Sequence, residues 1–242
     1  MVNISKTSLA SVSALAVLAF GTALPAVAHA DDSTASVTFQ ANTKPTTPVD
    51  PENPDNPFTP DQPATNDNGP LSIDFISNFN FGTQEITTKD AVYNAALTSG
   101  TDSTGAKTSK PNFVQVTDNT GTSKGWSLNV KQVAQLVNGT DSLQGAQISL
   151  SNLQAVSNSA SNATSPTVSG NLTLTPGTAA KITTADVNQG EGTWVTRFGK
   201  DATEGTNSVQ LSVPGASVKK ATTYTSTLDW TLTQTPDANN AL

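Results

Sequence analysis

Two of the three tryptophans in this chain stand in the same short frame, a Trp followed two positions later by a Leu. The first frame holds Trp126 and Leu128, and the second holds Trp230 and Leu232. In a β-strand, residues spaced in this way point to one face and lie about 6.6–6.8 Å apart. Each pair can therefore fill a hydrophobic core, or present an apolar platform to a sugar or a protein partner. The alternation leaves both uses open.

The distal frame belongs to a longer apolar stripe. In the same strand-like segment, Tyr224 and Leu228 share a face with Trp230 and Leu232. The third tryptophan, Trp194, lacks the frame, and we predict that it is an ordinary strand aromatic.

The usual catalytic groups are scarce. The chain has no Cys, and its single histidine, His29, falls within the export signal described below. Disulfides and cysteine nucleophiles are therefore excluded, as are histidine-assisted hydrolysis and His-ligated zinc in the exported chain. Asp118, Asp141, Asp186 and Asp229 could supply a carboxylate pair, but nothing in their spacing singles out two of them. We predict a protein that is not an enzyme and holds no cofactor and no metal ion.

The first thirty residues have the form of a signal peptide. Lys6 gives a weakly positive start, Leu9–Phe20 is an apolar run, and small residues at Ala28 and Ala30 suit a signal peptidase. We expect cleavage between Ala30 and Asp31. The apolar run is marginal for a membrane span of about 20 residues, so we disfavour a retained anchor.

Residues 31–70 differ in composition from the rest of the chain. They carry seven acidic residues against one Lys, and Thr43–Pro63 is rich in proline. Proline fixes φ and lacks a backbone donor, so we expect a disordered, extended, acidic leader rather than part of a packed core. This segment is either a plain leader, or a stalk or partner-binding arm.

The remainder, Leu71–Leu242, has twelve acidic and ten basic residues and is nearly neutral. No basic patch suggests nucleic acid, and an acidic chain gains little from an anionic membrane surface. We therefore expect no nucleic-acid partner and no direct membrane insertion of the mature chain.

Period-two alternation and frequent turn signals run through residues 71–242. They predict a single all-β domain, either a β-sandwich or a Greek-key barrel. Only Thr88–Leu97 has the pattern of a short helix. The strand-like segments are 71–82, 112–118, 125–132, 146–152, 169–177, 193–199, 208–215 and 223–234.

Four ordered blocks closely resemble the WxL-domain surface proteins of low-GC Gram-positive bacteria. They are Asn78–Ile86, Phe113–Lys131, Leu143–Asn152 and Tyr224–Pro236. The resemblance implies a secreted protein that attaches without a covalent bond to the cell wall, through the domain that carries both frames. It also implies peptidoglycan or another wall polymer as ligand, and membrane-anchored and wall-sorted companion proteins in a surface complex.

Carried over to this chain, the wall- or partner-binding motif falls on Trp126, Leu128, Trp230 and Leu232. The chain departs from the family pattern at Thr120, where many relatives have Arg, and at Asp229 before the distal Trp, where an uncharged residue is usual. Our leading hypothesis is a non-enzymatic wall-binding protein in which residues 71–242 bind and the leader projects. The alternative is a secreted adhesin or scaffold subunit that binds proteins, with the Trp-x-Leu strands purely structural.

Overall fold

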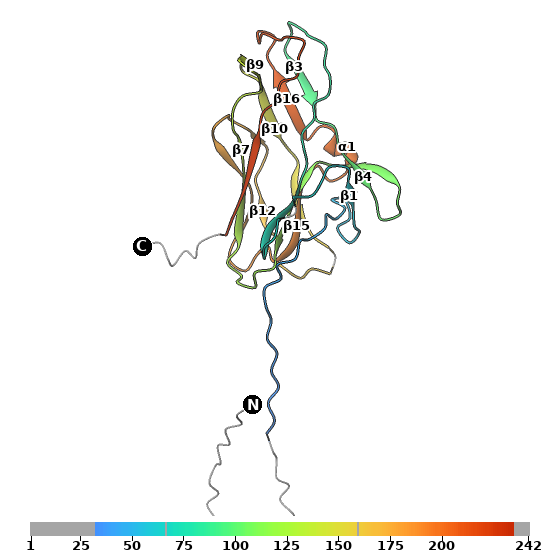
Figure 1. Ribbon diagram of the computed structural model, residues 1–242, viewed down its shortest axis with the longest axis vertical. Helices are drawn as coiled ribbons and strands as arrows, with labels where there is room; N and C mark the ends of the chain where they lie inside the picture. Colours follow the sequence, from blue (N-terminus) through green and yellow to red (C-terminus); the bar gives the residue numbers. More distant parts are fainter. Residues whose placement is uncertain (1–31, 66, 159, 235–242) are drawn as a thin grey trace, which may run out of the picture. The chain divides into compact units, whose positions relative to one another are not determined.

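The structure is a computed structural model that describes residues 32–65, 67–158 and 160–234 (Figure 1). The signal peptide and its expected cleavage between Ala30 and Asp31 lie outside the described residues. The chain divides into two units, Met1–Thr38 and Phe39–Leu242. Of the first unit, residues 32–38 are described, and their side chains are exposed. The second unit contains all of the helix and strand elements described below.

The second unit consists almost entirely of antiparallel strands, which confirms the all-β prediction. Only one short helix occurs among the described residues, and no helix there is long and apolar enough to cross a membrane. The elements are β1 (Thr59–Pro60), β2 (Leu71–Ile76), β3 (Ala91–Asn94), β4 (Thr98–Thr101), β5 (Lys107–Lys110), β6 (Phe113–Asp118), β7 (Trp126–Gln132), β8 (Val137–Asn138), β9 (Asp141–Ser142), β10 (Gln147–Leu150), β11 (Leu153–Val156), β12 (Thr167–Val168), β13 (Leu172–Thr173), β14 (Ala179–Ala185), β15 (Gly192–Phe198), α1 (Ala202–Gly205), β16 (Val209–Val213) and β17 (Leu228–Gln234).

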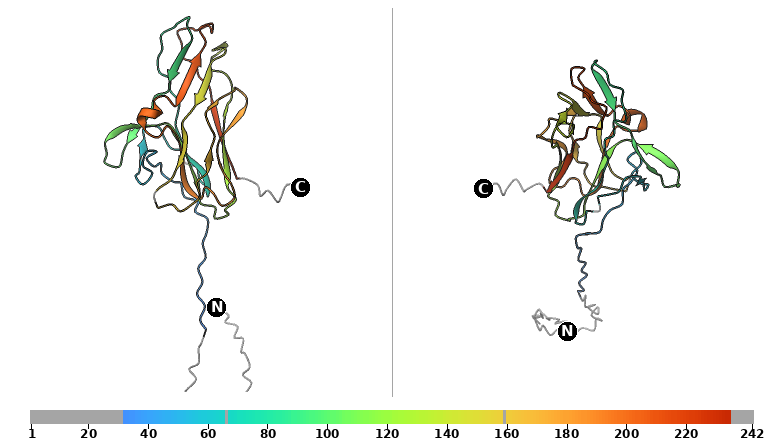
Figure 2. Two further views of the ribbon diagram at one scale, coloured as in Figure 1. Left: turned by 180° about the vertical axis from the view of Figure 1, so that it is seen from behind. Right: turned by 45° about the horizontal axis from the view of Figure 1, so that its top comes forward.

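Three four-stranded sheets form the body of the domain. The motif sheet has the order β12-β14-β7-β17, the facing sheet β11-β15-β6-β2, and the groove sheet β13-β10-β16-β3. Strand β10 of the groove sheet leads into β11 of the facing sheet through Ser151 and Asn152, and Asn152 has a φ of 55°. A three-stranded sheet, β1-β4-β5, lies outside these three, and its β4–β5 hairpin stands out from the sheets in both views of Figure 2.

The main core lies between the motif sheet and the facing sheet. Strand β7 buries every second residue, as its alternating sequence predicts, and β6 buries both of its faces. Val114 and Val116 from β6 and Phe198 from β15 belong to the same buried cluster as Leu128 and Val130 from β7. A hydrogen bond between the hydroxyls of Thr183 and Thr196, 2.7 Å long, links β14 to β15. The two sheets therefore pack face to face, as in a sandwich.

The structure differs from the expectation of a free leader between Thr47 and Thr65. Phe58 is 2% exposed, and its ring centroid lies 6.3 Å from that of Phe113. The next residue, Thr59, begins β1, which pairs with β4. Lys110 binds two leader carboxylates, with its Nζ 2.8 Å from Asp50 and 2.6 Å from Glu52. This part of the proline-rich segment is packed against the domain.

A side-chain amide also holds the backbone of the leader beside the antiparallel bridge between Val49 and Pro57. The Gln115 amide accepts the N–H of Val49 at 2.8 Å and donates to the carbonyl of Thr47 at 3.1 Å, as a neighbouring strand would. Asp74 accepts a second hydrogen bond from the same amide at 2.9 Å and another from Thr117 at 2.6 Å. Burial raises the pKa of Asp74. These hydrogen bonds fix the leader, so a fragment that began at Leu71 would leave the Gln115 amide without its leader partners.

The helix prediction for Thr88–Leu97 is wrong. Residues Ala91–Asn94 form strand β3, which pairs with β16, with Tyr93 opposite Leu211. Alternate side chains of β3 are half-buried and exposed, which is the pattern of an edge strand with one face on the core. Pairing with β16 buries Ala95 and half-buries Tyr93, and this tertiary gain exceeds a weak helical preference.

Candidate functional site: the two Trp-x-Leu strands and the groove beside them

The two Trp-x-Leu frames lie side by side on neighbouring strands. Strands β7 and β17 pair antiparallel, with Leu128 directly opposite Leu232 and Val130 opposite Trp230. Directly opposed residues of an antiparallel pair share one face, so all four motif residues turn to the inner face of the motif sheet. The sequence predicted the shared face within each strand, and the structure brings the two strands together.

The proximal frame is core. Trp126 and Leu128 are both 0% exposed, and the Trp126 indole donates a hydrogen bond of 3.0 Å to the carbonyl of Gly190. Glycines frame this ring: a Cβ added to Gly190 would lie 2.7 Å from the indole nitrogen, and one on Gly125 would lie 2.2 Å from the Ala185 carbonyl oxygen. A polymer outside the protein cannot touch either motif residue.

The distal frame lies at an edge. Strand β17 is the last strand of the motif sheet, and both Trp230 and Leu232 are half-buried against the core. The residues between and beside them, Asp229, Thr231 and Thr233, are exposed on the outer face. The same frame thus gives a buried pair on a central strand and an accessible pair on an edge strand.

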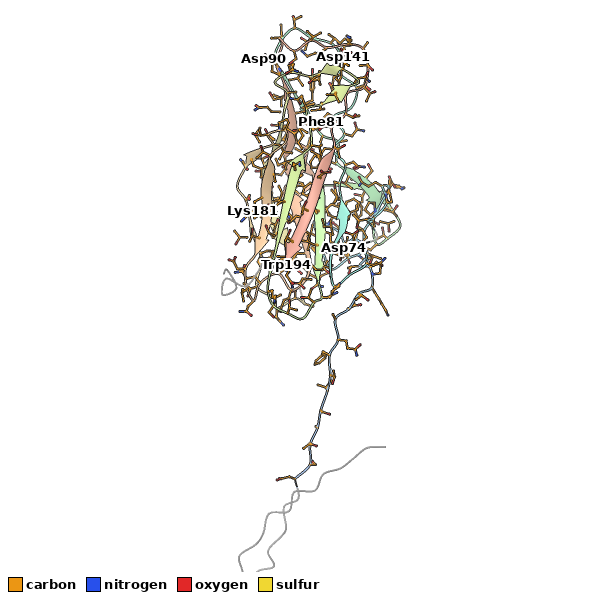
Figure 3. The ribbon with its side chains drawn as sticks, turned by 60° about the vertical axis from the view of Figure 1, so that its left-hand side comes forward. Asp74, Phe81, Asp90, Asp141, Lys181 and Trp194 are labelled. Atoms are coloured by element: carbon orange, nitrogen blue, oxygen red, sulfur yellow. The ribbon has the colours of Figure 1, made fainter. Side chains whose placement is uncertain are left out.

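Trp230 lines a groove of about 1060 Å³ at the end of the sheet where β17 begins. Buried aliphatic side chains from the groove sheet, Ile148, Leu211 and Val213, line the groove. Figure 3 shows Phe81 near this end of β17. The aromatic side chains that line the groove, all half-buried, are Phe79, Phe81, Tyr93, Tyr224 and Trp230.

The rim of the groove is polar. Exposed amide side chains of Asn78, Asn80 and Gln84 lie on one segment, and hydroxyls between Thr222 and Thr227 lie on another. The groove therefore combines apolar rings with hydrogen-bonding groups, which is the usual composition of a small-ligand or polymer site.

A strap, Lys219–Thr227, forms one side of the groove and is tied to the domain. Thr225 exchanges two backbone hydrogen bonds with Val137, of 2.8 and 2.9 Å, and Ser226 donates to the Ala134 carbonyl at 2.6 Å. Lys220 pairs with Asp141 at 2.8 Å, and this hydrogen bond raises the pKa of Lys220. The groove is thus formed by segments that are already in place.

The outer edge of β17 is paired with no other strand within the described residues, although residues of β2, the edge strand of the facing sheet, lie near β17. The N–H of Val133 donates to the Thr227 carbonyl at 2.9 Å, which makes these two residues a hydrogen-bonded pair. Antiparallel pairing alternates, so the backbone groups of Leu228, Trp230 and Leu232 point away from β7. Within the described part of the chain, these groups have no backbone partner. They are available beside the groove.

A comparison with protein families gives a match over residues 26–236 to the family described as "WxL domain surface cell wall-binding". The chain belongs to the WxL domain family. The WxL family is a wall-binding family and not an enzyme family, and its description places this protein at the cell surface, on the wall. Searches of curated proteins and of solved structures found no match to the chain.

Sequence reasoning found part of this candidate site. It placed Tyr224 on the face that carries Trp230, and the structure puts both side chains in the groove. It missed Phe79, Phe81 and Tyr93. The signal for the first two was their own two-residue spacing, but the strand that they were assigned to ends at Ile76. Tyr93 was hidden by the helix prediction. Trp194 is 6% exposed on β15, as expected of a strand aromatic.

Proposed function

We propose that this WxL domain attaches non-covalently to peptidoglycan by binding the glycan strand in the groove beside β17, with Trp230 as the central contact. One observation carries the proposal: of the two motif tryptophans, Trp126 is completely buried, whereas Trp230 lines the groove together with four more aromatic rings. Trp126 and Leu128 then hold the strand that Trp230 pairs with, and do not touch the polymer.

The chemistry of the groove suits a glycan. A sugar ring has an apolar face that packs on an aromatic ring, and it carries hydroxyl and N-acetyl groups around its edge. The groove offers both kinds of partner, because the rings of Trp230 and Tyr224 line it together with Asn78, Asn80 and Thr225. A long polymer also fits a groove bounded by two chain segments better than it fits a closed pocket.

Companion proteins at the surface, membrane-anchored or wall-sorted, remain a prediction from the family resemblance. One observation favours the second candidate function, a scaffold subunit that binds proteins: the free backbone edge of β17 can accept a strand. Both candidates use the distal frame and leave the proximal frame to the core.

The test is co-sedimentation of the folded chain, from Asp31 onward, with purified peptidoglycan. Trp230→Ala should weaken binding by about thirtyfold, the size of an interface hot spot. Thr231→Ala is the matched control, because it changes the next residue on the opposite, exposed face of β17. The same comparison can be made on β3, where Tyr93→Ala changes a residue that lines the groove and Val92→Ala, on the exposed face, is the control. Wild-type binding by folded Trp230→Ala and Tyr93→Ala variants would exclude this groove as the glycan site.

A further inference from the structure

A seven-residue segment before the packed leader has the pattern of a strand without a partner. In Ala35–Ala41, called the arm below, apolar and polar residues alternate. Val37 is 75% exposed and Phe39 is 88% exposed, while Ser36 and Thr38 occupy the opposite face. Among the described residues, nothing forms a backbone hydrogen bond with the arm. An exposed strand with an apolar face is a ready template for pairing with another chain.

The groove provides what the arm lacks. It has an apolar interior at Leu211, Val213 and Trp230, and the start of β17, from Leu228 to Trp230, borders it with an edge that no other strand pairs with. A strand added to this edge would gain main-chain hydrogen bonds and would turn every second side chain toward the groove.

We propose that the arm of one copy adds as a strand to the β17 edge of a second copy, with Val37 and Phe39 in the groove. This contact would regulate the proposed glycan site. The competition between the arm and the wall polymer for the groove rests on that proposed function. Self-association and wall binding then exclude one another at the groove, because both occupants cover Trp230.

The attachment point of the arm favours a second copy over its own chain. The N–H of Asn42 donates to the Asn119 carbonyl at 3.3 Å, and Asn119 follows the end of β6. This is the end at which β7 starts, whereas the groove lies where β7 stops and β17 begins. Phe39 is three residues from Asn42, a reach of about 10 Å, which is less than half the length of a seven-residue strand of about 23 Å.

The geometry has a consequence for assembly. The arm and its acceptor are different surfaces, so each copy can donate to one neighbour and accept from another. Such head-to-tail contacts form open chains whose length grows with protein concentration. In such an open assembly, only the copy at one end would have an unoccupied groove.

Sedimentation velocity over a range of concentrations tests the contact. Wild-type protein should form species larger than a monomer, and Val37→Asp with Phe39→Asp should weaken this association by about thirtyfold or more. Ser36→Asp with Thr38→Asp adds the same charge to the opposite face of the arm and should associate like wild type. Equal effects of the two double variants, or a wild-type protein that stays monomeric, would overturn the proposal.

The absence of cysteine allows a direct test of the acceptor. Mixing Phe39→Cys protein with Leu228→Cys protein under mild oxidation should give a disulfide-linked dimer, and Thr38→Cys in place of Phe39→Cys should give much less. Placing Phe39→Cys and Leu228→Cys in one dilute chain should leave it without an internal crosslink. Efficient closure within that single chain would show that the arm occupies its own groove, and would overturn the assignment to a second copy.

A peptide with the sequence of Ala35–Ala41 separates this inference from the proposed function. If both are correct, the peptide should release wild-type protein from peptidoglycan and should also break up the assemblies. If the protein never binds peptidoglycan but the peptide breaks up its assemblies, the glycan site is refuted and the arm contact is supported. The Trp230→Ala variant gives a further outcome. If it loses wall binding but still assembles, and the peptide still breaks up its assemblies, the groove is not the acceptor of the arm.

Discussion

The proximal and distal frames share the Trp-x-Leu pattern and have different surroundings. Strand β7 has a neighbour on each side, β14 and β17, and Trp126 and Leu128 are completely buried. Strand β17 has a neighbour on one side only, and Trp230 and Leu232 remain partly accessible. The position of a strand within its sheet therefore decides whether this frame supports the fold or can also contact a ligand.

The largest difference between the frames should appear on removal of the two indoles. Trp126→Ala leaves a large cavity in a closed core and should lower the free energy of unfolding by about 3–5 kcal/mol. Trp230→Ala removes a half-exposed ring, and we expect a loss of about 1 kcal/mol. Urea denaturation of both variants measures the two values. Similar losses from the two substitutions would mean that the distal indole is as structural as the proximal one.

The next prediction concerns the glycine that precedes the proximal indole. Gly125 has a φ of 75°, and an added Cβ would lie 2.2 Å from the Ala185 carbonyl oxygen. Gly125→Ala should therefore cost about 1–3 kcal/mol, since both the backbone and the neighbouring strand must shift. The distal frame has Asp229 at the corresponding position, so Asp229→Ala is the matched control, and we expect its stability to stay within about 0.5 kcal/mol of wild type.

Thermal unfolding monitored by tryptophan fluorescence measures both variants. A Gly125→Ala protein as stable as wild type would mean that the turn before β7 can rearrange, and that the proximal frame is less constrained than its packing indicates.

The sequence showed where along the chain the strands lie, but not their order within the sheets. Alternation of apolar and polar residues located β6, β7, β15, β16 and β17, because every second residue of a strand points to the same face. Nothing in that alternation shows which strand is central and which is at an edge, since this depends on pairing between segments a hundred residues apart. The different exposure of Trp126 and Trp230 was therefore beyond the reach of sequence analysis.

Long-range contacts also explain the other differences. The leader docks because Phe58 packs against Phe113, and because Asp50 finds Lys110 some sixty positions later. Its composition alone indicated an unpacked chain. Tyr93 was assigned to a helix because local propensity is all that a short segment shows, and the pairing of β3 with β16 is invisible to it.

A third prediction sharpens the comparison at the groove end of the central strand. Gln132 ends β7, is 0% exposed, and its amide has no hydrogen-bond partner within the described part of the chain. It lies opposite Leu228. Gln132→Met keeps an unbranched side chain of similar length and removes the buried amide, so we expect a gain in stability of about 1 kcal/mol.

Peptidoglycan co-sedimentation of the Gln132→Met protein should be unchanged, because this residue does not line the groove. A destabilised variant would indicate that the amide is paired in solution, and a variant that no longer binds would extend the binding site from the edge strand into the central strand.

The smallest expected effect tests the contact that joins the two frames. Leu128 and Leu232 are directly opposed on β7 and β17, so their side chains should stabilise one another by about 0.5–1 kcal/mol beyond their separate burial. A double-mutant cycle with Leu128→Ala and Leu232→Ala measures this coupling by urea denaturation. Leu128→Ala should be the more costly single substitution, at about 2–5 kcal/mol, because that side chain is completely buried. The same cycle with Leu232→Ala and Ile73→Ala, on the facing sheet, is the control. Equal coupling energies in the two cycles would show that Leu232 packs against the core in general, and that the pairing of the two frames contributes nothing specific to stability.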